Sequence, residues 1–153
     1  MNQPRQKRLA WAITGSGHYL RESLEILQSI ENVDIFLSKA AAEIIKQYGF
    51  QADLEATEHK VYQDKTASSV PVELFYEGKY HTLVIAPATS NTIAKMAYGF
   101  SDSLVTNLYA KQEKRACQVL FLHAIPCLKL VTSQLSQLHH AIILCKFFRD
   151  KLI

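Results

Sequence analysis

Four short apolar runs set the strongest limit on how this chain can fold. They occupy residues 8–14, 33–38, 82–87 and 118–124. Uninterrupted apolar runs of this length are typical of strands buried on both faces of a sheet. Helical spacing follows them, as in Leu20, Leu24 and Leu27, and no Asn-Gly or Asp-Gly hairpin signal joins two runs. Strands that alternate with helices predict an α/β domain built on a parallel sheet.

The intervening segments complete this outline. The sequence predicts a helix over residues 39–49 that Gly49 closes and a short helix over 71–78. It also predicts a polar turn that opens a helix over residues 88–99, and a further helix from Asp102. Residues 51–70 are polar and without periodicity, and we interpret them as a mobile excursion. We expect residues 1–153 to form a single domain, although the pattern does not place the tail from about residue 126.

Composition excludes several classes of protein. The hydrophobic fraction of 48% and the charged fraction of 20% are those of a globular protein. No apolar stretch is long enough to span a membrane and no leader is visible, so we expect a cytoplasmic location. Cys117, Cys127 and Cys145 lack metal-site spacing and favour reduced core thiols over zinc ligands or disulfides, although a reactive thiol stays open. The net charge of +3 has no dense basic cluster, which argues against nucleic-acid binding.

Small polar residues follow three of the apolar runs. In an open parallel sheet, ligands bind beyond the carboxyl ends of the strands, where such residues suit a phosphate. Each group also has a plainer interpretation, a tight turn for the first and a helix N-cap for the second. The third group is more polar than a cap requires, and its Asn91 can both donate to and accept from a heteroaromatic ring. The three groups are Gly15, Ser16 and Gly17; Ser38; and Ala88, Thr89, Ser90 and Asn91.

The segment "PATSNTIAKMAYGFSDSLVTN" resembles the PASANT region of the homo-oligomeric flavin-containing cysteine decarboxylases, with Pro87, Asn91, Lys95 and Asp102 in register. Two segments, this one and "WAITGSGHYLRESLEIL", are more similar still to a redox branch that includes archaeoflavoprotein and dihydromethanopterin reductase (acceptor). The resemblance covers about residues 8 to 110. It departs at Pro71, which stands where the decarboxylating members have a catalytic histidine.

This resemblance implies a flavodoxin-like, or Rossmann-like, three-layer sandwich with FMN as cofactor and an oligomer built on trimers. Ser16 and Ser38, with the Gly15 and Gly17 amides, would hold the phosphate, and the residues from Ala88 to Asn91 would line the flavin ring. The expected function is an FMN-dependent oxidoreductase or electron-transfer protein, with Asn91 in the chemistry. Its partners would be a nicotinamide cofactor or ferredoxin as donor and a small, pterin-like acceptor. The alternatives are a flavin-dependent decarboxylase or prenyltransferase, or a non-catalytic assembly subunit that binds a phosphate-bearing ligand.

Overall fold

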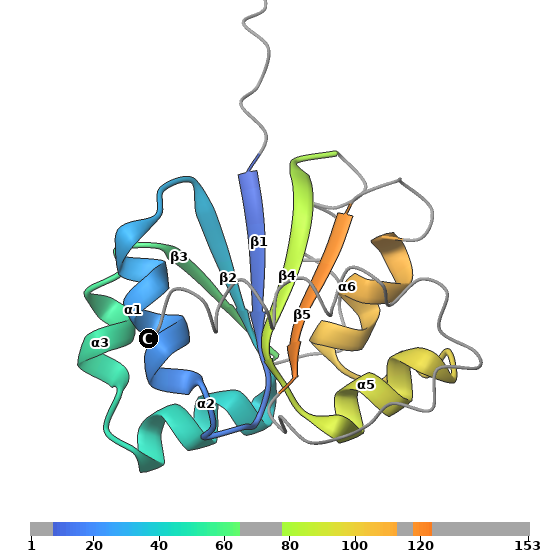
Figure 1. Cartoon of the computed structure of the whole chain (residues 1–153), viewed down its shortest axis with the longest axis horizontal. Helices are drawn as coiled ribbons and strands as arrows, with labels where there is room; N and C mark the ends of the chain where they lie inside the picture. Colours follow the sequence, from blue (N-terminus) through green and yellow to red (C-terminus); the bar gives the residue numbers. More distant parts are fainter. Residues whose placement is uncertain (1–7, 65–77, 113–117, 124–153) are drawn as a thin grey trace, which may run out of the picture.

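A computed structural model describes residues 8–64, 78–112 and 118–123 of the chain. Five parallel strands form one sheet in the order β3-β2-β1-β4-β5, and their arrows all point downward in Figure 1. The strands are β1 (Arg8–Ile13), β2 (Val33–Leu37), β3 (Lys60–Gln63), β4 (Tyr80–Ala88) and β5 (Gln118–His123). All four predicted strands are present, and the flavodoxin-like, or Rossmann-like, parallel fold class is confirmed.

Helices cover both faces of the sheet and make the fold a three-layer sandwich (Figure 1). On one face lie α1 (Leu20–Ser29), α2 (Lys39–Gln47) and α3 (Gln51–Glu55), and on the other lie α5 (Ser90–Ala97) and α6 (Leu104–Gln112). Gly49 follows α2 with a φ of 74°, a left-handed conformation that favours glycine and ends the helix as predicted. In the described part of the chain, no helix is both long and apolar enough to cross a membrane.

Two sequence predictions need correction. The expected excursion over residues 51–70 contains α3 and the edge strand β3, which pairs with β2 from Asp34↔Lys60 to Leu37↔Gln63. In addition, α6 begins at Leu104 and not at Asp102, because Ser103 caps it: the Thr106 N–H donates to the Ser103 hydroxyl over 3.3 Å. The helix expected over 71–78, apart from Gly78, and the tail from 126 lie outside the described residues.

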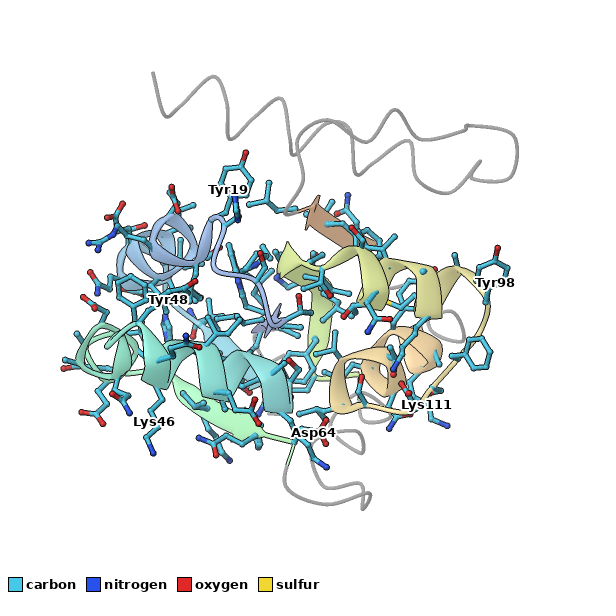
Figure 2. The ribbon with its side chains drawn as sticks, turned by 90° about the horizontal axis from the view of Figure 1, so that it is seen from below. Tyr19, Lys46, Tyr48, Asp64, Tyr98 and Lys111 are labelled. Carbon is cyan, nitrogen blue, oxygen red and sulfur yellow. The ribbon has the colours of Figure 1, made fainter. Side chains whose placement is uncertain are left out.

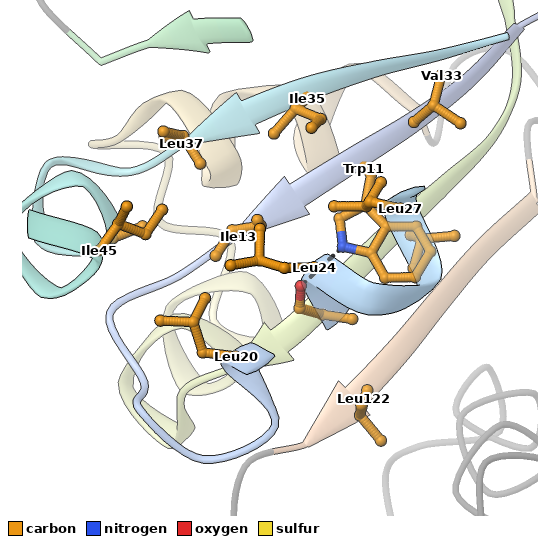
Figure 3. Close-up of a cluster of buried hydrophobic side chains, with 13 residues drawn as sticks. Trp11, Ile13, Leu20, Leu24, Leu27, Val33, Ile35, Leu37, Ile45 and Leu122 are labelled. Atoms are coloured by element: carbon orange, nitrogen blue, oxygen red, sulfur yellow. Dashed lines mark hydrogen bonds between the residues drawn. The ribbon is translucent and has the colours of Figure 1, made fainter. Parts of the chain in front are cut away.

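The core consists of two apolar layers, one on each face of the sheet. Alternate residues of β1 point to opposite faces, so Trp11 and Ile13 pack toward α1 and α2 while Ala10 and Ala12 face the layer of α5 and α6. Figure 3 shows the first layer, in which the indole nitrogen of Trp11 donates to the Ala86 carbonyl oxygen over 2.8 Å. This hydrogen bond ties β1 to β4 inside the core.

A buried carboxylate joins three strands near their amino ends. Asp34, 1% exposed, accepts hydrogen bonds from Arg8 over 2.7 Å, from Lys79 over 2.9 Å and from the Tyr80 hydroxyl over 2.5 Å. Burial by itself raises the pKa of Asp34, but the bonds from Tyr80 and Lys79 and the charge of Arg8 together hold that pKa below its usual value. The same burial, with the bond to Asp34, raises the pKa of Tyr80. This cluster fixes the edge of the sheet opposite the candidate site.

Candidate functional site

The candidate site lies at the carboxyl edge of the sheet, between β1 and β4. After β1 the chain adds β2 and β3 on one side, whereas β4 and β5 lie on the other side, so the strand order reverses between β1 and β4. Ligands of open α/β sheets bind in the crevice at this reversal. The loops after β1, β2 and β4 all lie at this edge, which is the lower edge in Figure 1 and faces the viewer in Figure 2.

The two glycines after β1 have a packing reason that the sequence did not reveal. A Cβ atom at Gly15 would lie 2.5 Å from the Cβ of Ala40, and one at Gly17 would lie 2.7 Å from the ring of Tyr48. Neither glycine has a positive φ. The loop therefore needs glycine in order to lie directly against α2. This contact brings the candidate phosphate-binding residues after β1 close to those after β2.

The two serines expected to bind phosphate both lie beside this contact. Ser16 is 8% exposed, and its hydroxyl oxygen accepts from the His18 N–H over 3.2 Å. Ser38 is half-buried and caps α2, because its hydroxyl oxygen accepts from the Ala41 N–H over 3.1 Å. The Ser38 hydroxyl therefore keeps a hydrogen with which it can donate to an anion. The Ser16 hydroxyl already donates to the His18 carbonyl oxygen, but this contact is long, at 3.5 Å, and an anion that binds here would replace it.

The segment after β4 forms the start of α5. Ala88 is fully buried at the end of β4, and Thr89 caps α5 by accepting from the Thr92 N–H over 3.2 Å. Ser90 and Asn91 are the first two residues of the helix, and Asn91 is exposed at the surface of this edge. The polar turn is thus a helix cap followed by an accessible amide side chain.

Thr14, directly after β1, bonds to the end of β4 and to the N-cap of α5, a role that the sequence did not reveal. Its hydroxyl donates to the Pro87 carbonyl oxygen over 2.7 Å and accepts from the Thr89 N–H over 2.8 Å. Thr14 is 1% exposed. A threonine at the end of an apolar run gives no sequence signal of such a role, because its partners lie more than 70 residues away.

Unpaired backbone donors gather at the same edge. Among the described residues, the N–H groups here that donate to no hydrogen bond include those of Gly15, Gly17, Lys39, Ala40 and Asn91. The last three belong to the first turns of α2 and α5, where helix N–H groups have no partner within the helix and the helix dipole favours negative charge. Donors without acceptors, beside two serine hydroxyls, fit a phosphate group.

The described residues give no comparable evidence of a metal site, because they hold no group of three or more His, Cys, Asp or Glu side chains able to bind an ion.

The fold and the carboxyl edge of the sheet together define a class: a parallel α/β protein with a phosphate-compatible site where the strand order reverses. A model of the family described as Flavoprotein matches residues 2–143. The chain belongs to this flavoprotein family.

Several relatives make the similarity more specific. Dihydromethanopterin reductase (acceptor) of Methanosarcina mazei is 35% identical over 121 residues, which are 71% of this chain and 51% of the relative. The crystal structure of DmrB of Burkholderia xenovorans in complex with FMN, described as a cubic protein cage for redox transfer, is 44% identical with a TM-score of 0.72, over 80% of this chain and 67% of that one.

A relative from another reaction class is more distant. The flavin prenyltransferase UbiX of Deinococcus radiodurans is 28% identical over 107 residues, which are 65% of this chain and 52% of that protein. The chain spans about half the length of these two curated relatives.

Proposed function

We propose that this chain is an FMN-binding oxidoreductase or electron-transfer flavoprotein. The observation that carries the proposal is the set of unpaired N–H groups and serine hydroxyls on two loops that pack together at the switch point. The FMN complex of the 44% identical DmrB supports the choice of cofactor, and the reductase relatives support redox chemistry.

The residues divide between the two ends of the cofactor. Ser16, Ser38 and the amides of Gly15 and Gly17 would hold the phosphate. The segment from Ala88 to Asn91, with Thr89 and Ser90 between them, would line the flavin ring. Bound FMN supplies the redox chemistry, accepting and passing on electrons or hydride.

Asn91 is the proposed chemical participant from this chain. Its side chain is exposed at the start of α5, beside an unpaired N–H group of its own backbone. An amide that hydrogen-bonds the flavin ring stabilises the charge that builds up on reduction more than it stabilises the oxidised ring. Asn91 would therefore raise the tendency of the bound flavin to accept electrons.

The proposed partners are those that the family resemblance implies, and the reductase relatives and the DmrB cage support a redox partner and a homo-oligomer. We propose a small, pterin-like electron acceptor, a nicotinamide cofactor or ferredoxin as donor, and a homo-oligomer built on trimers. Tyr98 is 82% exposed and Phe100 is 63% exposed, at the end of α5 (Figure 2 labels Tyr98). Large exposed aromatic side chains so close together are typical of an interface.

Absorption spectroscopy of the purified protein, reconstituted with flavin if necessary, tests the cofactor assignment. We expect a flavin spectrum, release of FMN and not FAD by acid, and bleaching of the spectrum under anaerobic conditions with a nicotinamide donor or reduced ferredoxin. A protein that gains no flavin spectrum on reconstitution, or that releases FAD, would contradict the assignment.

Prenyl transfer to flavin is the second candidate, since the chain is also similar to the Deinococcus prenyltransferase. Incubation of the FMN-loaded protein with dimethylallyl phosphate separates the two functions. Prenylated flavin, identified by its mass, would favour the second candidate, whereas unmodified FMN that still accepts electrons favours the first. A cysteine-containing peptide assayed in the same way for loss of carbon dioxide tests the decarboxylase alternative.

A further inference from the structure

We propose that Thr14 is a positioning residue of the FMN site, whose hydroxyl group holds the end of β4 and the start of α5 against the loop after β1. This inference rests on the proposed FMN site. It assigns to Thr14 the relative placement of the two ends of that site, the phosphate side and the ring side, without direct contact with the cofactor.

Three hydrogen bonds connect Thr14 to Pro87, near the end of β4, and to Thr89, the N-cap of α5. Its hydroxyl donates to the Pro87 carbonyl oxygen over 2.7 Å, its backbone N–H donates to the same oxygen over 3.2 Å, and its hydroxyl oxygen accepts from the Thr89 N–H over 2.8 Å. Because Thr14 is 1% exposed, water does not compete well for these bonds. The hydroxyl thus donates to the end of β4 and accepts from the N-cap of α5.

The link passes directly into the ring side of the site. The Thr89 residue that Thr14 holds by its N–H group is also the N-cap of α5, and its own hydroxyl accepts from the Thr92 N–H over 3.2 Å. Asn91 lies in the first turn of that helix. A change in the position of Thr89 therefore moves the start of α5 and, with it, Asn91.

The same residue also begins the phosphate side. The Thr14 carbonyl oxygen accepts from the Ser16 N–H over 2.8 Å, and Gly15 follows directly with its backbone against Ala40 of α2. Thr14 is consequently the point at which the loop that carries Ser16 and the helix that carries Asn91 are held at a fixed separation. Preorganisation of this kind raises affinity because the protein does not have to order the two loops when the ligand binds.

A second buried threonine provides a matched control. Thr57, 6% exposed, donates its hydroxyl to the Leu54 carbonyl oxygen over 2.7 Å and accepts from the His59 N–H over 3.4 Å. It lies between α3 and β3, at the amino end of β3 and away from the candidate site. Replacing this threonine by valine removes the same kind of hydrogen bonds as replacing Thr14, but far from the FMN site.

The experiment compares Thr14→Val, Thr14→Ser and Thr57→Val with the wild type by titration of FMN and by the visible spectrum of the bound flavin. We expect Thr14→Val to weaken FMN binding at least tenfold and to shift the flavin bands, Thr14→Ser to stay within about twofold of the wild type, and Thr57→Val to leave affinity and spectrum unchanged. If Thr14→Val kept the FMN affinity and the flavin spectrum of the wild type, the role of Thr14 would be overturned and the proposed function would stand. Failure of the wild type to bind FMN would overturn the proposed function, and this inference with it.

Amide hydrogen exchange of the FMN-free wild type gives a test that does not depend on the folding of a variant. We expect the Thr89 N–H to be strongly protected, because it donates to a buried hydroxyl, while the unpaired Asn91 N–H exchanges quickly. Equally fast exchange at both positions would overturn the inference.

Discussion

Substitution of Gly15 by alanine should destabilise the protein because it forces the loop after β1 away from α2. The new Cβ atom would lie 2.5 Å from the Cβ of Ala40, about 0.9 Å inside the 3.4 Å at which ordinary contact begins. Since Gly15 has no positive φ, alanine adds no backbone penalty there. Overpacking of this kind costs about 1–3 kcal/mol, and we expect about 2 kcal/mol because both atoms are attached directly to backbone.

The double variant Gly15→Ala/Ala40→Gly isolates the contact. Once the Ala40 methyl group is gone, the nearest atoms of residue 40 lie 3.4 and 3.5 Å from the new Cβ, which is ordinary contact. Ala40→Gly alone should cost at most about 1 kcal/mol through helix propensity. The double variant should therefore be about as stable as Ala40→Gly, with a coupling free energy of about 2 kcal/mol.

Urea unfolding at a fixed protomer concentration measures these free energies. Gly17→Ala serves as the control, because the ring that its Cβ would meet belongs to Tyr48, which is 56% exposed and can swing outward. This variant should lose less than about 1 kcal/mol. Strictly additive effects of Gly15→Ala and Ala40→Gly would refute the packing explanation for the first glycine.

Three further predictions concern the Asp34 cluster, the oligomer and Asn91. Asp34→Asn should lower the free energy of unfolding by about 2–3 kcal/mol at neutral pH. This loss is smaller than for a fully buried ion pair because the two cationic partners of Asp34 are each 30% exposed. Asp102→Asn, which removes a surface ion pair, should change the free energy of unfolding little. Since the pKa of Asp34 is lowered in the folded protein, this stabilisation is complete above the unfolded-state value of about 4 and is lost as the pH falls through the folded-state pKa, so unfolding curves of wild type and Asp34→Asn should converge in acid and diverge as the pH rises. Light scattering should give a trimer or a multiple of it for the wild type and a smaller species for Tyr98→Ser/Phe100→Ser; an unchanged mass would remove these aromatics from the interface. Asn91→Ala should make bound FMN harder to reduce, and an unmoved midpoint potential would exclude Asn91 from the chemistry.

The sequence predicted the central strands well because burial on both faces leaves a continuous apolar run. It missed β3 because this strand lies at the edge of the sheet, pairs only with β2 and keeps polar residues such as Lys60 and Gln63 at its ends. A short strand of this kind has little apolar signal, and only its pairing with β2 makes it a strand.

Within the candidate site, the sequence predicted which loops matter but not why their residues are needed. From the sequence, the glycines after β1 fitted either a tight turn or a phosphate site. The structure adds a packing reason, which is the close approach of Gly15 to Ala40. It also passed over Thr14, whose partners Pro87 and Thr89 become neighbours only when β1 and β4 pair. Such contacts depend on tertiary structure, so local patterns carry no trace of them.

Comparison of FMN with riboflavin tests the central claim most directly, because the two ligands differ only in the phosphate. Trp11, the only tryptophan of the chain, lies in β1, the strand that leads into the site. Its fluorescence provides the readout for both titrations. We predict that the wild type binds FMN much more tightly than riboflavin. We also predict that Ser16→Ala/Ser38→Ala loses at least tenfold in FMN affinity with riboflavin affinity unchanged, since a hydrogen bond to a charged group contributes about 1.5–3 kcal/mol. Equal wild-type affinity for the two ligands, or unchanged FMN affinity in the double variant, would contradict the account.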